Sequence, residues 1–281
     1  DRLHHAGENL LQIEEQGGYY WGWYSSSQDT KATLRITTKE APDDLIASLD
    51  LGPGTLSGSA VHEGKLHLAR ANQGKLLVDV YALEDDSAKR LASVETQLTD
   101  VSGNPKLKPF FLDDEKIIWI TDGSQSSSYY PYEYLMDDVV DPYPNYGSGT
   151  VEAHSFVFEE GLSESTLTHE ANASITLSGN VQWSEPLLLN DRILYGSSVT
   201  RHLYDSKQTG RIVSSDVNAS LLGFDLSDPE NLTTLAPASL PGLLVGLHAS
   251  DGDSGEAYLF AESEDTAIDY YRPMPVILED E

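Results

Sequence analysis

Cysteine is absent from this sequence of 281 residues. Its absence excludes disulfide bonds, thiolate nucleophiles and cysteine-ligated zinc sites together. Long apolar runs are absent too, because none approaches the roughly 18 residues that a membrane-spanning helix requires. We therefore expect no membrane-spanning segment.

Basic residues are scarce: 17 Lys and Arg stand against 46 Asp and Glu, for a formal net charge of −29. Such an excess of negative charge repels nucleic acid and anionic lipid. We therefore expect no nucleic-acid partner. The same charge favours the recruitment of divalent cations, and the alternative is a solvated acidic surface without a bound ion.

Catalytic motifs are also lacking. The eight histidines show no HExxH or HxH spacing, and there is no GxSxG, no glycine-rich phosphate loop and no ordered Ser, His and Asp set. His62 and His67 flank one expected hairpin, where we interpret both as surface or edge residues. A carboxylate pair for glycoside hydrolysis stays open, because acidic residues occur throughout and their separation depends on the fold.

The sequence does contain a repeated pattern, which is complete between residues 179 and 240. Two short apolar runs flank the turn pair Asn190-Asp191, and a later run ends in the turn Ser227-Asp228-Pro229-Glu230-Asn231. In that turn Pro fixes φ, while Asp and Asn side chains cap the backbone. The pattern predicts an antiparallel meander of four strands.

The same pattern recurs along the chain, with acidic turns at matching places such as Glu63-Gly64 and Asp113-Asp114. A repeat of roughly 40 to 50 residues suits one blade of a β-propeller. We predict an all-β fold, a β-propeller of four-stranded antiparallel blades that is incomplete in this chain. A β-sandwich is the alternative. The expected blades span residues 1–52, 54–98, 103–178 with an insertion at 122–150, 179–240 and, in part, 242–281.

The last expected unit supplies only half a blade, and a bare sheet edge invites aggregation. We expect Asn9–Glu14 or a partner chain to pair with Tyr258–Ala261. The chain begins without Met and stops soon after a unit begins, which we interpret as a fragment or a processed product. The rest of a longer chain, or a partner chain, would then close the propeller.

Two aromatic-rich stretches are the candidate binding surfaces. In the first, strand alternation places Tyr19, Trp21 and Trp23 on one side. The second is the insertion at 122–150, whose tyrosines are Tyr129, Tyr130, Tyr132, Tyr134, Tyr143 and Tyr146. Tyrosine offers a large contact area at low entropic cost. We predict recognition of a protein or glycan partner, and the alternative is that these rings cover a neighbouring blade or subunit.

One stretch resembles a metal-binding loop. Asp251 and Asp253 alternate with small residues before Gly255, and calcium requires several oxygen ligands from one turn. The glycine comes one position earlier than in an EF-hand loop, so an ordinary acidic hairpin turn is the alternative. The expected cofactor is either none or Ca²⁺ at Asp251 and Asp253.

Several segments together resemble the secreted β-propeller-domain proteins of bacteria and archaea. They are LLGFDLSDPEN followed by SLPG, the opening DRLHHAGENLLQI and the Tyr/Pro loop after IIWITD. The chain departs from the family pattern where Leu232 replaces a second Pro and Leu240 replaces Ile. The resemblance implies a propeller fold and export to an extracellular, periplasmic or cell-surface location. It implies no catalytic residue.

The sequence therefore favours a non-catalytic exported propeller that acts as a protein- or glycan-interaction platform, within a larger surface assembly. Two alternatives stay open. One is a glycan-active hydrolase or lyase that uses a carboxylate pair at the mouth of the propeller, and the other is a calcium-stabilised structural domain.

Overall fold

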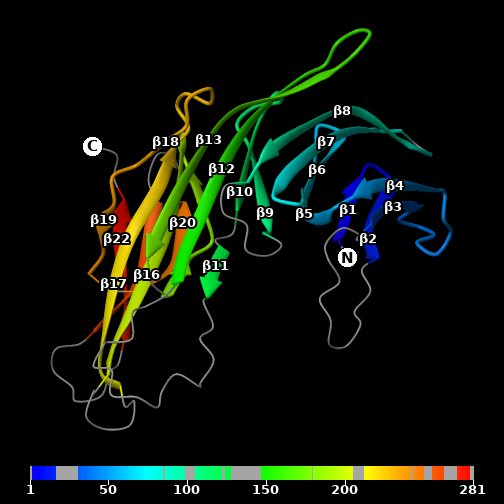
Figure 1. Cartoon of the computed structure of the whole chain (residues 1–281). Helices are drawn as coiled ribbons and strands as arrows, with labels where there is room; N and C mark the ends of the chain where they lie inside the picture. The colour runs from blue at the N-terminus through cyan, green and yellow to red at the C-terminus, as the bar shows by residue number, and fades with distance from the viewer. Residues whose placement is uncertain are drawn as a thin grey trace. The chain divides into compact units, whose positions relative to one another are not determined.

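The structure is a computed structural model, and the residues it describes are 2–16, 31–84, 86–98, 105–121, 124–127, 147–178, 180–204, 212–241, 243–249, 255–262 and 271–278. Within these residues the chain is all-β: they form antiparallel strands and no helix (Figure 1). The all-β class is confirmed, and two of the five sheets that the described residues form are the four-stranded antiparallel meanders expected from the sequence.

Two sheets are four-stranded meanders in which consecutive strands pair. Sheet A consists of β1 (Arg2–Ala6), β2 (Asn9–Gln16), β3 (Lys31–Thr38) and β4 (Ala47–Pro53). Sheet B consists of β5 (Thr55–His62), β6 (Lys65–Asn72), β7 (Lys75–Leu83) and β8 (Ala88–Gln97).

Three further sheets follow in chain order. Sheet C contains β9 (Leu107–Phe111), β10 (Lys116–Thr121), β11 (Ser124–Ser127), β12 (Gly147–Glu159) and β13 (Thr166–Ser178). Sheet D contains β14 (Asn180–Trp183), β15 (Leu187–Leu189), β16 (Arg192–Tyr204), β17 (Ile212–Asp225), β18 (Thr233–Thr234) and β19 (Ala238–Ser239). Sheet E contains β20 (Leu243–Ala249), β21 (Gly255–Glu262) and β22 (Tyr271–Leu278).

The chain divides into two compact units. Unit 1 comprises residues 1–121 and 153–172, and unit 2 comprises residues 122–152 and 173–281.

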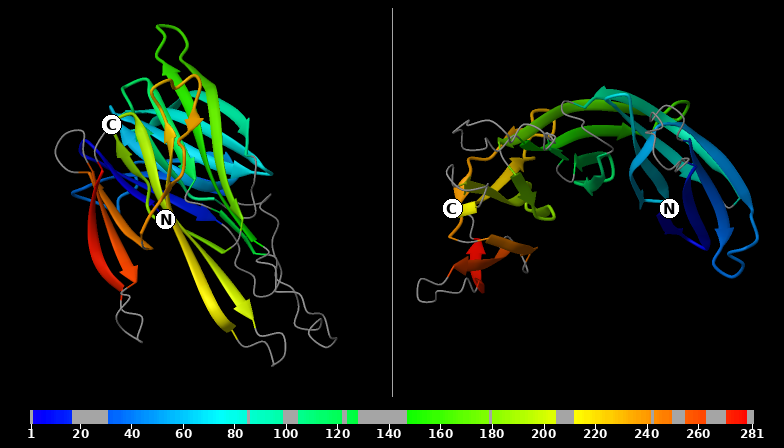
Figure 2. Two further views of the ribbon diagram at one scale, coloured as in Figure 1. Left: turned by 90° about the vertical axis from the view of Figure 1, so that its left-hand side faces the viewer. Right: turned by 60° about the horizontal axis from the view of Figure 1, so that its bottom comes forward.

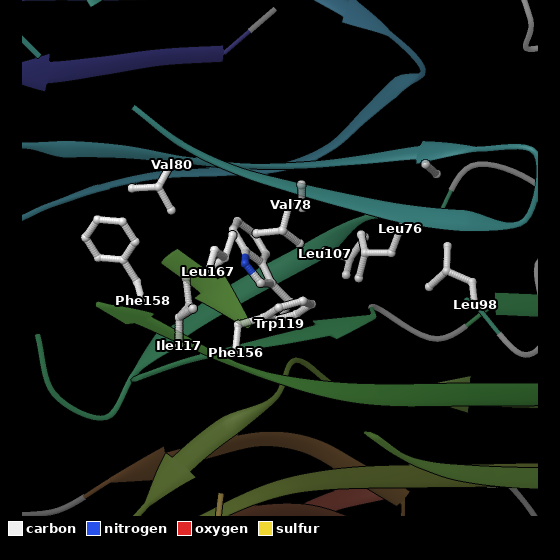
Figure 3. Packing of buried hydrophobic residues seen from close by; sticks show 12 residues of the cluster. Leu76, Val78, Val80, Leu98, Leu107, Ile117, Trp119, Phe156, Phe158 and Leu167 are labelled. Atoms are coloured by element: carbon white, nitrogen blue, oxygen red, sulfur yellow. The ribbon is translucent and has the colours of Figure 1, made fainter. Parts of the chain in front are cut away.

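Sheet B is buried on both faces within unit 1, which explains why β7 reads KLLVDVYAL with little alternation. On one face Leu66, Leu68 and Tyr81 join a core with Leu11 and Leu34 of sheet A. On the other face the core belongs to sheets B and C (Figure 3). Its fully buried members include Leu76, Val78, Val80, Trp119 and Phe156.

Unit 2 is built around the β16–β17 hairpin, which pairs Arg192 with Asp225 at one end and Tyr204 with Ile212 at the other. The left view of Figure 2 shows the two strands running side by side. Beneath them Trp183, Tyr195 and Phe224 form a chain of edge-to-face rings, with centroids 6.1 and 6.3 Å apart. Such contacts add roughly 0.5–1.5 kcal/mol each beyond the area they bury.

The expected pairing of Asn9–Glu14 with Tyr258–Ala261 is wrong. The backbone of β21 pairs with β20 on one side and with β22 on the other, whereas β2 pairs with β1 and β3 in sheet A. Closing a hairpin between neighbouring segments costs less chain entropy than recruiting a distant strand. Proline disfavours a central strand, because it cannot donate a hydrogen bond to the ladder. The edge strand β22 nevertheless accommodates Pro273 and Pro275.

A buried ion pair between β6 and β7 of sheet B also reaches sheet A through a hydrogen bond to β4. Asp79 is fully buried and Arg70 is 3% exposed. Arg70 donates one hydrogen bond to the Asp79 carboxylate and another, of 2.7 Å, to the carbonyl oxygen of Pro53 at the end of β4. Arg90 lies farther out, with its Nη1 3.9 Å from Asp79 Oδ1.

We expect Asp79→Ala to lower the free energy of unfolding by about 3–5 kcal/mol, because it leaves Arg70 buried without its counterion. Urea denaturation measures this loss. Glu95→Ala is the matched control, since it removes the partner of Lys75 from an exposed pair and should cost less than about 1 kcal/mol. Equal losses in the two variants would contradict the buried role of Asp79.

Gly58 allows sheet B to approach sheet C. A β-carbon at this position would lie 2.3 Å from Trp119 Cζ3 and 2.8 Å from the carbonyl oxygen of Leu107.

Gly58→Ala should therefore destabilise the protein by about 1–3 kcal/mol through overpacking. The cost should shrink in a Trp119→Phe background, where the clashing ring atom is missing, and a double-mutant cycle measures that coupling. Additive effects would show that the two residues do not compete for this space.

Candidate functional site

Exposed carboxylates collect at one end of unit 1. In an antiparallel meander, every second turn lies at the same end of the sheet. The β1–β2 and β3–β4 turns therefore share one end of sheet A, and the β5–β6 and β7–β8 turns share one end of sheet B. Contacts join these groups across sheets. Asn9 Nδ2 donates a 3.4 Å hydrogen bond to the carbonyl oxygen of Glu84, and Lys65 of sheet B forms a 3.0 Å ion pair with Glu160 of sheet C.

We call this end the acidic rim. All its carboxylate residues are exposed, and they are Glu8, Glu40, Asp43, Asp44, Glu63, Glu84, Asp86, Asp113, Asp114, Glu115, Glu159, Glu160 and Glu164. The described connections at the opposite end, residues 53–54 and 73–74, carry no acidic side chain. Among the described turn residues of unit 1, the acidic side chains therefore lie at the rim.

Within the rim, the β5–β6 turn presents a histidine beside a carboxylate. His62 ends β5, and Glu63 and Gly64 form the turn with φ values of 45° and 69°. Two positive φ values match the twist of a tight hairpin. The His62 ring stacks on Phe111 of β9, with centroids 4.1 Å apart and planes 14° apart, so its orientation is fixed by sheet C.

The β9–β10 turn is held by Asp113, whose carboxylate accepts hydrogen bonds from the backbone nitrogens of Glu115 at 2.9 Å and Lys116 at 2.7 Å. Partial burial acts to raise the pKa of Asp113, but these hydrogen bonds and the charge of Lys116 together outweigh it and lower the pKa below its ordinary value. The neighbouring Asp114 points outward, with its side chain 82% exposed.

These two turns bring His62, Glu63 and Asp114 together, with one donor atom from each residue lying within 4.8 Å of the others. His62 Nε2 is shielded from solvent, has no hydrogen-bond partner and lies 3.7 Å from Asp114 Oδ1. The sequence analysis missed this cluster because its residues come from turns of two different sheets. The recurrence of acidic turns at matching places was the available signal.

His67 lies beneath the cluster and is 3% exposed. Its ring meets Phe111 edge to face, with centroids 5.1 Å apart. Burial lowers the pKa of His67 to about 4, with smaller contributions from the charges of His62 and Lys65. His67 is therefore neutral near pH 7 and belongs to the core, so its interpretation as a surface or edge residue is wrong.

The binding and metal residues predicted from the sequence lie outside the described residues, and their roles stay predictions. They are Tyr19, Trp21, Trp23, Tyr129, Tyr130, Tyr132, Tyr134, Tyr143, Tyr146, Asp251 and Asp253. In the part of the chain that the structure describes, no helix is long and apolar enough to cross a membrane.

No family model and no curated protein matches this chain. Among solved structures, a mutant of the apocarotenoid oxygenase from Synechocystis is similar with a TM-score of 0.34 and 10% identity, over 98% of this chain and 59% of the oxygenase chain. A protein from Lactobacillus plantarum is similar with a TM-score of 0.32 and 9% identity, over 95% of this chain and 81% of its own. Neither similarity is strong enough to assign a fold or an activity.

The burial of neutral His67 predicts a loss of stability in acid. Its folded pKa of about 4 lies below the unfolded value of 6.5, so the unfolded chain binds a proton that the folded chain does not. The free energy of unfolding should fall as the pH drops from about 6.5 to about 4, by roughly 3 kcal/mol from this residue.

Urea denaturation of wild type and His67→Phe across this pH range, with chelator present, isolates the contribution of His67. The carboxylates titrate in both proteins, so the difference between the two curves reports the histidine. A difference that does not change between pH 7 and pH 4 would show that His67 is not buried as a neutral group.

Proposed function

We propose that this chain is a non-catalytic, exported interaction module, built as a series of β-propeller blades, that binds a protein partner through the acidic rim. The observation that carries the proposal is the rim itself. Exposed carboxylates of successive turns gather at one end of unit 1, whereas the described connections at the other end have none.

The arrangement of strands in unit 1 supports blades of a propeller. Sheets A and B are consecutive four-stranded meanders, and sheet B packs through opposite faces on sheets A and C. The first strands of the three sheets contact one another in turn: β1 contacts β5, and β5 contacts β9. Strands around a propeller axis follow one another in this way. Export rests on the resemblance of LLGFDLSDPEN and its companion segments to secreted propeller proteins.

The chemistry of the rim favours a basic protein surface as its partner. Exposed carboxylates attract complementary charge from a distance and accelerate association. Lys and Arg side chains of a partner would then form charge-assisted hydrogen bonds with them. An uncharged glycan would gain little from the rim and would depend on the aromatic residues of 19–24 and 122–150 instead.

The rival function, a glycan-active hydrolase or lyase, requires a carboxyl group that holds a proton near neutral pH. Asp113 in the rim has a lowered pKa for the reasons given above. In unit 2, hydrogen bonds from the side chain and backbone of Ser227 lower the pKa of Asp225. Both groups are held as carboxylates, which suits binding better than proton donation.

Charge reversal in the rim tests the proposal. A variant with Asp43→Lys, Asp86→Lys and Glu164→Lys should bind an oligolysine peptide roughly tenfold more weakly than wild type, or weaker still, because like charges then oppose docking. Fluorescence anisotropy over a series of NaCl concentrations measures the affinity. The difference between variant and wild type should shrink as salt screens the charges.

The matched control reverses the same number of exposed carboxylates outside the rim, with Glu95→Lys, Glu185→Lys and Glu230→Lys. Its affinity should stay within about threefold of wild type at physiological salt, because the carboxylates of the rim are unchanged. Equal weakening in the two variants would show that binding follows net charge, which would overturn the rim as a platform. Turnover of a glycoside by the wild-type chain would favour the enzyme instead.

A further inference from the structure

We infer that His62, Glu63 and Asp114 form a binding site for one divalent transition-metal ion, with Zn²⁺ as the preferred occupant. The site joins the β5–β6 turn of sheet B to the β9–β10 turn of sheet C within unit 1. The inference does not depend on the partner proposed for the acidic rim.

The spacing of the donor atoms fits a shared ion. Zn²⁺ binds histidine nitrogen and carboxylate oxygen at about 2.0–2.2 Å, so two of its ligand atoms lie no more than about 4.4 Å apart. The 3.7 Å between His62 Nε2 and Asp114 Oδ1 is too long for a hydrogen bond and lies within that limit. The widest separation in the cluster, up to 4.8 Å, closes by rotation of the exposed Glu63 side chain.

His62 Nε2 is the second observation that points to an ion. This atom is shielded from solvent and has no hydrogen-bond partner, whereas most buried polar atoms have one. The His62 side chain as a whole is 29% exposed, so an ion can reach this nitrogen from the solvent side of the rim. The stacked ring of Phe111 holds the imidazole in place, so a cation beside Nε2 would find this ligand already oriented.

The donor set selects the metal. One imidazole and two carboxylates suit Zn²⁺ and its neighbours in the transition series, whereas Ca²⁺ and Mg²⁺ prefer oxygen ligands alone. Three protein ligands leave a fourth position of the ion for water or for a donor of a partner molecule. The ring of Phe111 covers one face of the His62 imidazole, whereas both carboxylates are open to solvent.

Zinc titration of the chelator-treated full chain, without a histidine tag, tests the site. Competition with a zinc-sensitive dye gives the affinity, and an excess of Ca²⁺ in the buffer occupies the other exposed carboxylates. Asp114→Asn and Glu63→Gln should each weaken Zn²⁺ binding roughly tenfold or more. Replacing a residue that only supports a metal ligand commonly costs 10–100-fold in affinity, and these two residues would bind the ion directly. Zn²⁺ should also raise the melting temperature of wild type.

Glu115→Gln is the matched control, since it changes the charge of the same turn by the same amount but lies outside the cluster. It should bind Zn²⁺ as wild type does. His62→Phe keeps a ring to stack on Phe111 but removes the nitrogen, and should abolish the visible absorption of bound Co²⁺. If His62→Phe fails to fold, the comparison of Asp114→Asn with Glu115→Gln still decides.

Three outcomes would overturn the site. They are the absence of Zn²⁺ binding by wild type, equal weakening by Asp114→Asn and Glu115→Gln, and unchanged binding by folded His62→Phe. The second outcome would assign the binding to diffuse attraction by the acidic rim.

Discussion

The burial of sheet B on both faces is the constraint on which unit 1 depends. Leu66 and Leu68 pack toward sheet A, while Val78 and Val80 pack toward sheet C. A sheet with two apolar faces is stable only between two others, so its neighbours are determined by its composition. The missing side chain of Gly58 lets Trp119 approach sheet B closely. The core therefore sets the distance between sheets as well as their order.

This stacking also determines what the turns can do. Because consecutive sheets pack face to face, the turns of one sheet lie beside those of the next, and residues far apart in the sequence become neighbours. His62 meets Phe111 and Asp114 for this reason. The buried pair of Arg70 and Asp79 ties the same sheet to the end of β4. Surface chemistry at the rim is thus a consequence of core packing beneath it.

Much of this organisation could be predicted from the sequence, because turn chemistry is local. Asp228 accepts a hydrogen bond from the backbone of Glu230, as expected for the Asp-Pro turn. The sequence predicted only part of a blade at 242–281, whereas the structure adds β22, an edge strand that pairs with β21 despite Pro273 and Pro275. The cluster of His62 and Asp114 was missed because no spacing within one segment encodes a contact between two sheets. Its residues were visible only as similar turns in successive repeats.

The acidic rim lowers the stability of unit 1, because the like charges at this end repel one another. Lysines reduce this repulsion locally: Lys65 lies 3.0 Å from Glu160, and Lys116 lies 3.5 Å from Asp113. Glu63 and Asp114 instead converge on the imidazole of His62. A cation held there would neutralise these two carboxylates, as Lys65 neutralises Glu160. Like that ion pair, it would connect sheet B to sheet C. With such an ion bound, the same residues would both neutralise charge at the rim and hold sheets B and C together.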